Sequence, residues 1–221
     1  MSRFALALTL VASLTTSAFA THAYAPNTEF VRPPTPSKID VPPAVAMPQR
    51  LMDRATIRAK LIEQRAANLA RFRAYQKAGV FPVNTVRPGK LNVWIDDDGH
   101  ICAAATIIKM SGLDELVQRT GEQNNFIRLA DVKQGPLMDW MLTSGFTQAE
   151  VAEIQRPFSY TGGDDRSGVT VPSQRATETA RLARLYRQIT AKLVKNQKAS
   201  IEIAVSRLMK HPELAWRLLD A

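Results

Sequence analysis

Two stretches of helically spaced apolar residues constrain the fold most strongly. In residues 49–78 the predicted apolar stripe consists of Leu51, Ala55, Ile62, Ala66 and Leu69. From about residue 175 the predicted stripe consists of Leu182, Leu185, Tyr186, Ile189 and Leu193. An amphipathic helix must bury its apolar face, so we expect these two long helices to pack together in a bundle. Gly79 is a suitable stop for the first helix.

Shorter helices are predicted between and after the two long ones. The alanines that follow Cys102 should enter a helix that ends near Gly112. Further helices are expected at residues 113–120, 135–144 and 147–155, and the last begins with the capping-box pattern Thr147-x-x-Glu150. The apolar phase shifts near Asn196, which predicts a break before a helix at 199–210. Pro212 then suits the first position of a terminal helix.

The stretch WIDDDGHICAAATII, residues 94–108, contains the strongest strand and turn signals. LNVWID is rich in β-forming residues, and Asp98-Gly99 favours a two-residue hairpin turn with HICAA as the return strand. In this register Asp97 lies opposite His100. We therefore predict a mainly α fold, a helical bundle-like domain with one small β-hairpin near residues 91–104.

The amino-terminal residues predict export. Arg3, the apolar stretch from Phe4 to Leu14 and the A-x-A patterns ending at Ala20 and Ala25 are typical of a cleaved signal peptide, residues 1–25. The apolar stretch is too short to span a bilayer, and no integral membrane span is expected. The predicted location is periplasmic or secreted.

The rest of the chain divides by composition. Residues 26–48 hold seven prolines and predict a disordered leader. Residues 49–221 are expected to form a single mainly helical domain. Its parts are the long basic helix at 49–79, an acidic middle at 80–156, a loop at 157–174 and a basic helical tail at 175–221.

Charge is distributed unevenly along the chain, whose formal net charge is +9. Residues 49–79 have a net charge of +6, residues 80–170 of −4, and residues 171–221 of +6. The basic helices can either pack around the acidic middle or face an external anionic partner. Complete internal pairing would still leave a basic excess, so both arrangements are expected to contribute.

A row of arginines lies beside the predicted stripe of the first helix and forms the candidate anion-binding site. It consists of Arg50, Arg54, Arg58 and Arg65. Like charges four residues apart repel each other, and a partner with carboxylates or phosphates would relieve that repulsion. The alternative is a solvated helix face.

Asp97, His100 and Cys102 form the only candidate catalytic group that the sequence suggests. In the predicted hairpin they share one face, and they provide a carboxylate, a base and a thiol. The competing interpretation is a buried structural cysteine, because Cys102 follows Ile101 and precedes three alanines. As the only cysteine in the chain, Cys102 has no partner for an intrachain disulfide.

No metal or cofactor site is predicted. A calcium loop with Gly99 at its sixth position would place Trp94 and Ala105 at ligand positions one and twelve, so this loop is rejected. His100, His211 and Cys102 are too scattered for a zinc site. Nucleotide-binding, zinc-protease and serine-hydrolase motifs are absent from the sequence.

These observations favour a non-catalytic envelope or secreted protein that uses basic helices to bind an anionic partner. The candidate partners are an anionic polymer, a membrane surface or an acidic protein. Whether the chain is an enzyme is left open, with a thiol-dependent enzyme using Cys102 and His100 as the alternative. Nucleic acid is the least favoured partner, because the basic helices offer few aromatic side chains for stacking.

Overall fold

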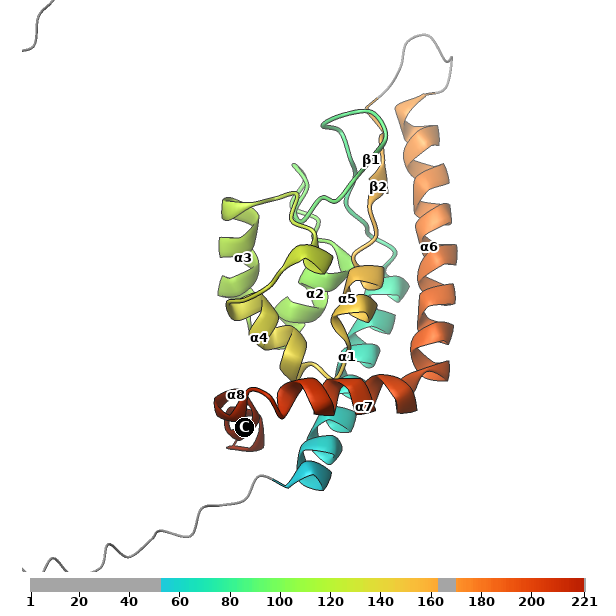
Figure 1. Cartoon of the computed structure of the whole chain (residues 1–221). Helices are drawn as coiled ribbons and strands as arrows, with labels where there is room; N and C mark the ends of the chain where they lie inside the picture. The colour runs from blue at the N-terminus through green and yellow to red at the C-terminus, as the bar shows by residue number, and fades with distance from the viewer. Residues whose placement is uncertain (1–52, 163–169, 221) are drawn as a thin grey trace, which may run out of the picture. The chain divides into compact units, whose positions relative to one another are not determined.

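The first long helix, α1, comprises Arg54–Ala78 and contacts helices from both halves of the domain. A computed structural model describes residues 53–162 and 170–220, shown in Figure 1. The Asp53 side chain caps α1 by accepting hydrogen bonds of 3.0 Å from the backbone N–H groups of Ala55 and Thr56. Gly79 ends the helix at φ 66°, a left-handed conformation that favours glycine, which confirms the predicted stop.

The buried face of α1 differs from the predicted stripe. Its buried residues are Ile57, Leu61, Arg65, Asn68, Leu69, Phe72 and Tyr75. Ile62 is 40% exposed, and Ala55 and Ala66 are also exposed. The prediction failed because Arg65 and Asn68, two polar residues, occupy buried positions. The hydrophobic pattern therefore favoured the neighbouring face of the helix, which contains Ile62 and Ala66.

The middle of the chain forms short elements close to those predicted. They are α2, Ala103–Met110; α3, Asp114–Gln123; the 3₁₀ helix η1, Leu129–Asp131; α4, Pro136–Thr143; and α5, Gln148–Ile154. Thr147 and Glu150 form the predicted capping box at the start of α5. The Gln155 side chain holds the loop between α3 and η1 in place. It donates a hydrogen bond to the Ile127 carbonyl and accepts one from the Leu129 N–H, both at 2.8 Å.

The strands pair differently from the predicted hairpin. Strand β1, Lys90–Leu91, pairs antiparallel with the distant β2, Phe158–Ser159. The predicted turn is present nearby, but only an isolated bridge between Ile95 and Ile101 links its two arms. The Gly99 N–H donates to the Asp96 carbonyl at 3.0 Å, so Asp97 and Asp98 occupy the centre of the turn. The register therefore shifts by one residue, and Asp96 lies opposite His100.

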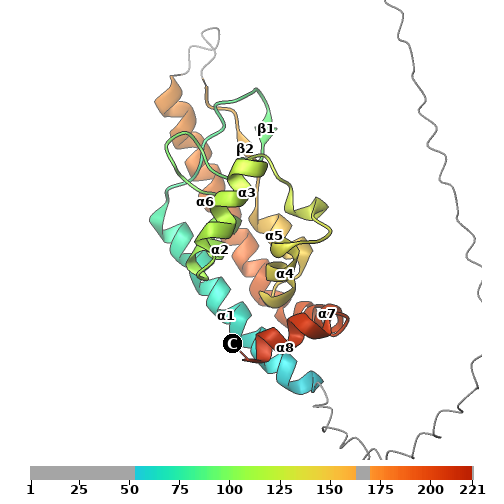
Figure 2. The ribbon, with the colours of Figure 1, turned by 90° about the vertical axis from the view of Figure 1, so that its left-hand side faces the viewer.

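The carboxyl-terminal part contains α6, Val171–Lys195; α7, Gln197–Leu208; and α8, Pro212–Asp220. The predicted break at Asn196 and the proline at the start of α8 are confirmed. The predicted loop at 157–174 is shortened at both ends, by β2 and by the early start of α6. Figure 1 shows α7 crossing the domain from the end of α6 and leading into α8, and Figure 2 shows α7 nearly end-on beside α8.

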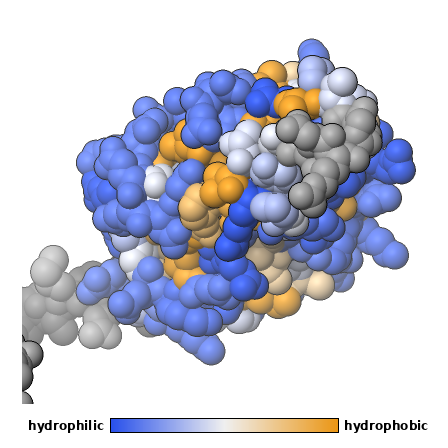
Figure 3. All heavy atoms as spheres, turned by 90° about the horizontal axis from the view of Figure 1, so that it is seen from above, coloured by the Kyte–Doolittle hydropathy of each residue, from blue (hydrophilic) through white to orange (hydrophobic). Residues whose placement is uncertain are grey.

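Two apolar clusters hold these helices together. In the larger one, Phe72 and Tyr75 of α1 contact Tyr186 of α6, with ring centroids 5.5 and 5.7 Å apart. This contact confirms that the two long helices pack together. In the smaller one, Ile57 and Leu61 pack with residues of α7 and α8. Figure 3 shows that apolar residues also reach the surface between hydrophilic ones at the end of the domain seen from above.

The described residues all belong to one compact unit, Gln49–Ala221. The predicted signal peptide and leader, residues 1–48, and Arg50 lie outside the described residues, as does the segment 163–169. The domain is thus mainly helical with one two-stranded sheet, as the sequence predicted, although the strands come from other segments.

Candidate functional site

Cys102 lies at the amino-terminal cap of α2 and is fully buried. Its Sγ accepts a hydrogen bond of 3.5 Å from the Ala105 N–H. Burial raises the pKa of the Cys102 thiol to about 12, because the thiolate would lose its hydration. A buried thiol that stays protonated is inert, so this geometry supports the structural role of Cys102.

Asp97, His100 and Cys102 do not form the expected catalytic group. His100 Nδ1 lies 3.1 Å from the carboxylate of Asp96, whereas Asp97 accepts a hydrogen bond of 3.3 Å from the Thr85 hydroxyl. Among the described residues, no hydrogen bond joins His100 to Cys102. The prediction depended on the hairpin register, and the one-residue shift replaces Asp97 with Asp96 as the neighbour of His100.

Asp96, Asp98 and His100 are the described residues that could hold a metal ion. Their ligand atoms all lie within 4.8 Å of one another. However, Asp96 already accepts hydrogen bonds of 2.8 to 3.1 Å from the backbone N–H groups of Val83, Asp98 and His100. Asp98 lies 3.7 Å from Arg175. These contacts explain how the group stabilises the turn without any ion.

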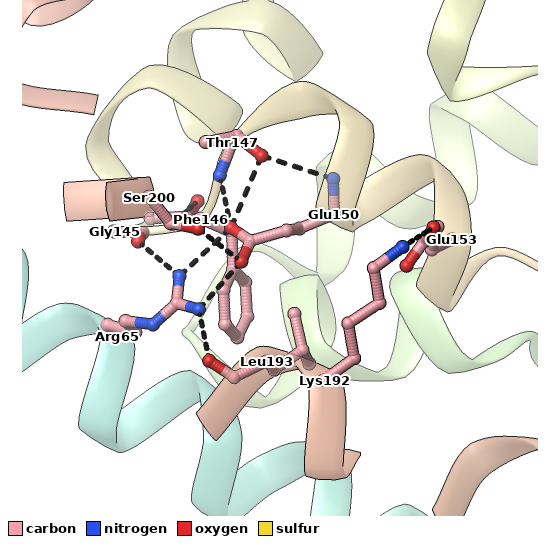
Figure 4. Close-up of polar contacts among 10 residues, drawn as sticks. Arg65, Gly145, Phe146, Thr147, Glu150, Glu153, Lys192, Leu193 and Ser200 are labelled. Atoms are coloured by element: carbon pink, nitrogen blue, oxygen red, sulfur yellow. Dashed lines mark hydrogen bonds and ion pairs between the residues drawn. The ribbon is translucent and has the colours of Figure 1, made fainter. Parts of the chain in front are cut away.

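Arg65, one of the four predicted anion-binding residues, is buried inside the domain (Figure 4). Its guanidinium forms a bidentate ion pair with Glu150 and also donates to the carbonyls of Gly145 at 3.0 Å and Leu193 at 2.7 Å. The Phe146 ring lies beneath it, with its centroid 5.0 Å from Cζ. The prediction that Arg65 belongs to an anion-binding row is therefore wrong, because this buried side chain is inaccessible to an external anion.

Glu150 completes this polar centre. Its carboxylate accepts hydrogen bonds from the Ser200 hydroxyl at 2.7 Å and from the Thr147 N–H at 2.8 Å. Burial would raise the pKa of Glu150, but hydrogen bonds from Arg65, Thr147 and Ser200 outweigh it and lower the pKa below its usual value. The pair links α1, α5, α6 and α7, and its many partners identify it as a structural element rather than a ligand site.

Arg54 and Arg58 lie on the surface of α1, where both form ion pairs with Glu202 of α7. Arg54 also donates to the Ser206 hydroxyl at 3.0 Å. One carboxylate is shared by two guanidinium groups, so this exposed cluster keeps a positive charge. The predicted row thus provides two surface cations, with Arg65 buried and Arg50 outside the described residues.

A groove of about 430 Å³ lies where α1 meets the junction between α6 and α7. We call it the basic groove, and it is lined by Arg58, Ile62, Val194, Lys195, Gln197, Lys198 and Ile201. Lys195 and Lys198 were not predicted as candidate residues. Their position on either side of the predicted helix break at Asn196 is the sequence signal that could have identified them.

A second groove, of about 610 Å³, lies between α1, α3, α4 and α8. Trp140 contributes to its wall, and the indole N–H donates to the Ser111 hydroxyl at 3.2 Å. Its charged lining residues pair with each other, Arg119 with Glu115 and Arg217 with Asp139. This groove therefore lacks the charge excess of the basic groove.

Within residues 53–162 and 170–220, no helix has both the length and the hydrophobicity that a membrane span requires. Comparisons with protein-family models, curated proteins and solved structures found no match to this chain. The function is therefore inferred from the geometry and charge of the surface grooves.

Proposed function

We propose that this protein is a non-catalytic binding protein whose basic groove recognises an anionic partner. One observation carries the proposal. The groove combines Arg58 of α1 with Lys195 and Lys198 at the α6–α7 junction, on a single shallow surface. Three cations from segments more than a hundred residues apart in sequence are thereby placed together by the fold.

The charge of the groove is only partly neutralised. Lys195 and Lys198 have no ion-pair partner among the described residues, and Arg58 shares Glu202 with Arg54. Exposed ion pairs contribute about 0–1 kcal/mol, so an incoming anion can compete with Glu202 for Arg58 at little cost. The same cations would also raise the rate of encounter with an anionic partner at low ionic strength.

The two alternative functions receive less support. A thiol-dependent enzyme would need a reactive Cys102, but that side chain is fully buried and has a raised pKa. A nucleic-acid-binding protein would benefit from aromatic side chains for base stacking, and none of the residues that line the basic groove is aromatic.

The proposed setting is the periplasm or the exterior of the cell. Support comes from the sequence alone, through Arg3, the apolar stretch at residues 4–14 and the A-x-A patterns that follow. Amino-terminal sequencing of the exported protein should begin at Thr21 or Pro26. Recovery of the protein with Met1 intact would contradict this proposal.

Binding to two probes tests the anion-binding function. We would measure affinity for poly-L-glutamate and for phosphatidylglycerol vesicles at low salt and at increasing salt concentrations. Wild-type protein should bind at least one probe, with an affinity that falls as salt screens the charges. The double variant Lys195→Gln/Lys198→Gln should bind at least about tenfold more weakly, since each lysine contributes about 1 kcal/mol near an anionic surface.

A charge-matched control separates the groove from net charge alone. Lys90 and Lys210 are exposed lysines that line neither the basic groove nor another groove, so Lys90→Gln/Lys210→Gln removes the same charge elsewhere. This control should bind nearly as well as wild type. Equal losses in the two double variants would show that binding depends on net charge and would refute the assigned groove.

A further inference from the structure

The basic groove exposes apolar side chains between its cations. Ile62 of α1 is 40% exposed and Val194 of α6 is 48% exposed, and both line the groove with Arg58, Lys195 and Lys198. The neighbouring Ile201 is buried and anchors α7 to the smaller apolar cluster. The groove therefore presents positive charge and accessible hydrocarbon within one surface.

We infer that the partner of the basic groove is the surface of an anionic phospholipid bilayer. This inference depends on the proposed anion-binding function and specifies its partner. Lipid phosphates complement the charge of Lys195, Lys198 and Arg58. The adjoining acyl chains and glycerol carbons complement Ile62 and Val194, for which a hydrophilic polyanion offers no favourable contact.

The side chains suit the layered chemistry of such an interface. Lysine has a long aliphatic stem, so its ammonium group can remain at the level of the phosphates while shorter apolar side chains lie deeper. Lys195 and Val194 are adjacent residues in the last turn of α6, and Lys198 follows across the helix break. Charged and apolar groups thus alternate over a short distance on a surface formed by packed helices.

The fold holds this surface in place before any lipid binds. Leu61 and Ile57 of α1 pack with Ile201 and Val205 of α7, and Arg65 donates to the carbonyl of Leu193. These contacts fix α1 relative to the α6–α7 junction on the buried side of the groove. Peripheral binding therefore requires no rearrangement of the helices, and its strength should depend on the exposed side chains alone.

The experiment compares an apolar variant with a charge variant on two probes. Ile62→Ser/Val194→Ser removes the hydrocarbon, and Lys195→Gln/Lys198→Gln removes the charge. Binding is measured by co-sedimentation with phosphatidylglycerol vesicles and by titration with poly-L-glutamate, with phosphatidylcholine vesicles as a neutral surface. The apolar control is Val80→Ser/Val86→Ser, because both valines are exposed and neither lines the groove.

The inference predicts a distinct pattern of losses. Ile62→Ser/Val194→Ser should weaken vesicle binding about tenfold and leave any binding of poly-L-glutamate unchanged, since partial burial of two aliphatic side chains accounts for such a factor. Lys195→Gln/Lys198→Gln should weaken binding to every anionic probe. Phosphatidylcholine vesicles should bind poorly, and the apolar control should behave as wild type.

Other outcomes separate this inference from the proposed function. Unchanged vesicle binding by Ile62→Ser/Val194→Ser, or binding to poly-L-glutamate alone, would overturn the membrane inference and keep the anion-binding function. A protein that binds neither anionic probe at low salt would overturn both. If Ile62→Ser/Val194→Ser instead dissociates a dimer in analytical ultracentrifugation, without loss of vesicle binding, the apolar patch joins two copies of the chain and the inference fails.

Discussion

The guanidinium group of Arg65 and the carboxylate of Glu150 form two hydrogen bonds, of 2.9 and 2.7 Å, across 85 residues of sequence. The geometry is bidentate, and both side chains are withdrawn from solvent. Two backbone carbonyls accept further hydrogen bonds from Arg65, and the Ser200 hydroxyl donates to Glu150. These additional hydrogen bonds offset part of the cost of burying the two charges.

Removing either member of this pair should destabilise the protein strongly. Arg65→Ala or Glu150→Ala should lower the free energy of unfolding by about 3–5 kcal/mol, because each leaves a buried charge without its partner. Urea denaturation followed by circular dichroism measures the change. The exposed pair formed by Arg119 and Glu115 is the control, and its single variants should cost less than about 1 kcal/mol. Equal losses at the two pairs would contradict the structural role of Arg65.

The position of Arg65 shows how much of the fold the sequence could predict. Helix ends were predicted well because their signals are local, as at Gly79, Thr147 and Pro212. The buried face of α1 was predicted wrongly, because a hydrophobic pattern cannot anticipate a buried arginine whose carboxylate partner lies in a distant helix. For the same reason Ile62 was assigned to the core, although it lines the basic groove.

The strands illustrate a second limit. Strands β1 and β2 have two residues each and pair Leu91 with Phe158, so neither segment carries a recognisable alternation and the partner is far away in sequence. The hairpin turn was predicted at nearly the right place, but Asp97 and Asp98 occupy its centre instead of Asp98 and Gly99, so the register is shifted by one. This shift places Asp96 instead of Asp97 beside His100, and the predicted catalytic group required Asp97 at that position.

Stability should fall in acid, partly because of Glu178. Burial would raise the pKa of Glu178, but hydrogen bonds from Arg181 and the Ser159 N–H lower it below its usual value. A folded-state pKa below the unfolded value stabilises the protein above about pH 4.5, and this contribution is lost as the pH falls through the folded-state pKa. In thermal denaturation, the stability difference between wild type and Glu178→Gln should therefore narrow below about pH 4.5. A difference that does not change between pH 7 and pH 3 would contradict this assignment.

Gly145 should tolerate no side chain. Its φ is 77°, and a Cβ atom would lie 2.2 Å from the Leu61 carbonyl oxygen and 2.6 Å from the backbone nitrogen of Arg65. Gly145→Ala should cost more than about 3 kcal/mol, since backbone strain adds to the displacement of α1. Gly112 is the matched control, because its φ is 89° and no atom lies within 4 Å of the added Cβ. Gly112→Ala should cost about 1–2 kcal/mol, and similar losses at both positions would refute the close contact at Gly145.

Cys102 should be unreactive in the native protein. Its burial and a pKa of about 12 predict slow modification by a thiol reagent at neutral pH, with rapid reaction once urea unfolds the chain. Cys102→Ala should fold normally, whereas Cys102→Ser should lose about 1–3 kcal/mol because the buried hydroxyl lacks a good partner. Fast native labelling would restore the thiol-enzyme alternative.

The polar centre around Arg65 has a consequence for the order in which the chain can fold. Arg65 is synthesised long before Glu150, Leu193 and Ser200, so α1 leaves the ribosome with a guanidinium group that it cannot yet bury. The apolar residues Ile57 and Leu61 likewise cannot be fully buried until α7 and α8 have been synthesised. Native docking of the amino-terminal half of α1 is therefore postponed until the last helices exist, although its carboxyl-terminal half can pack on α2 earlier.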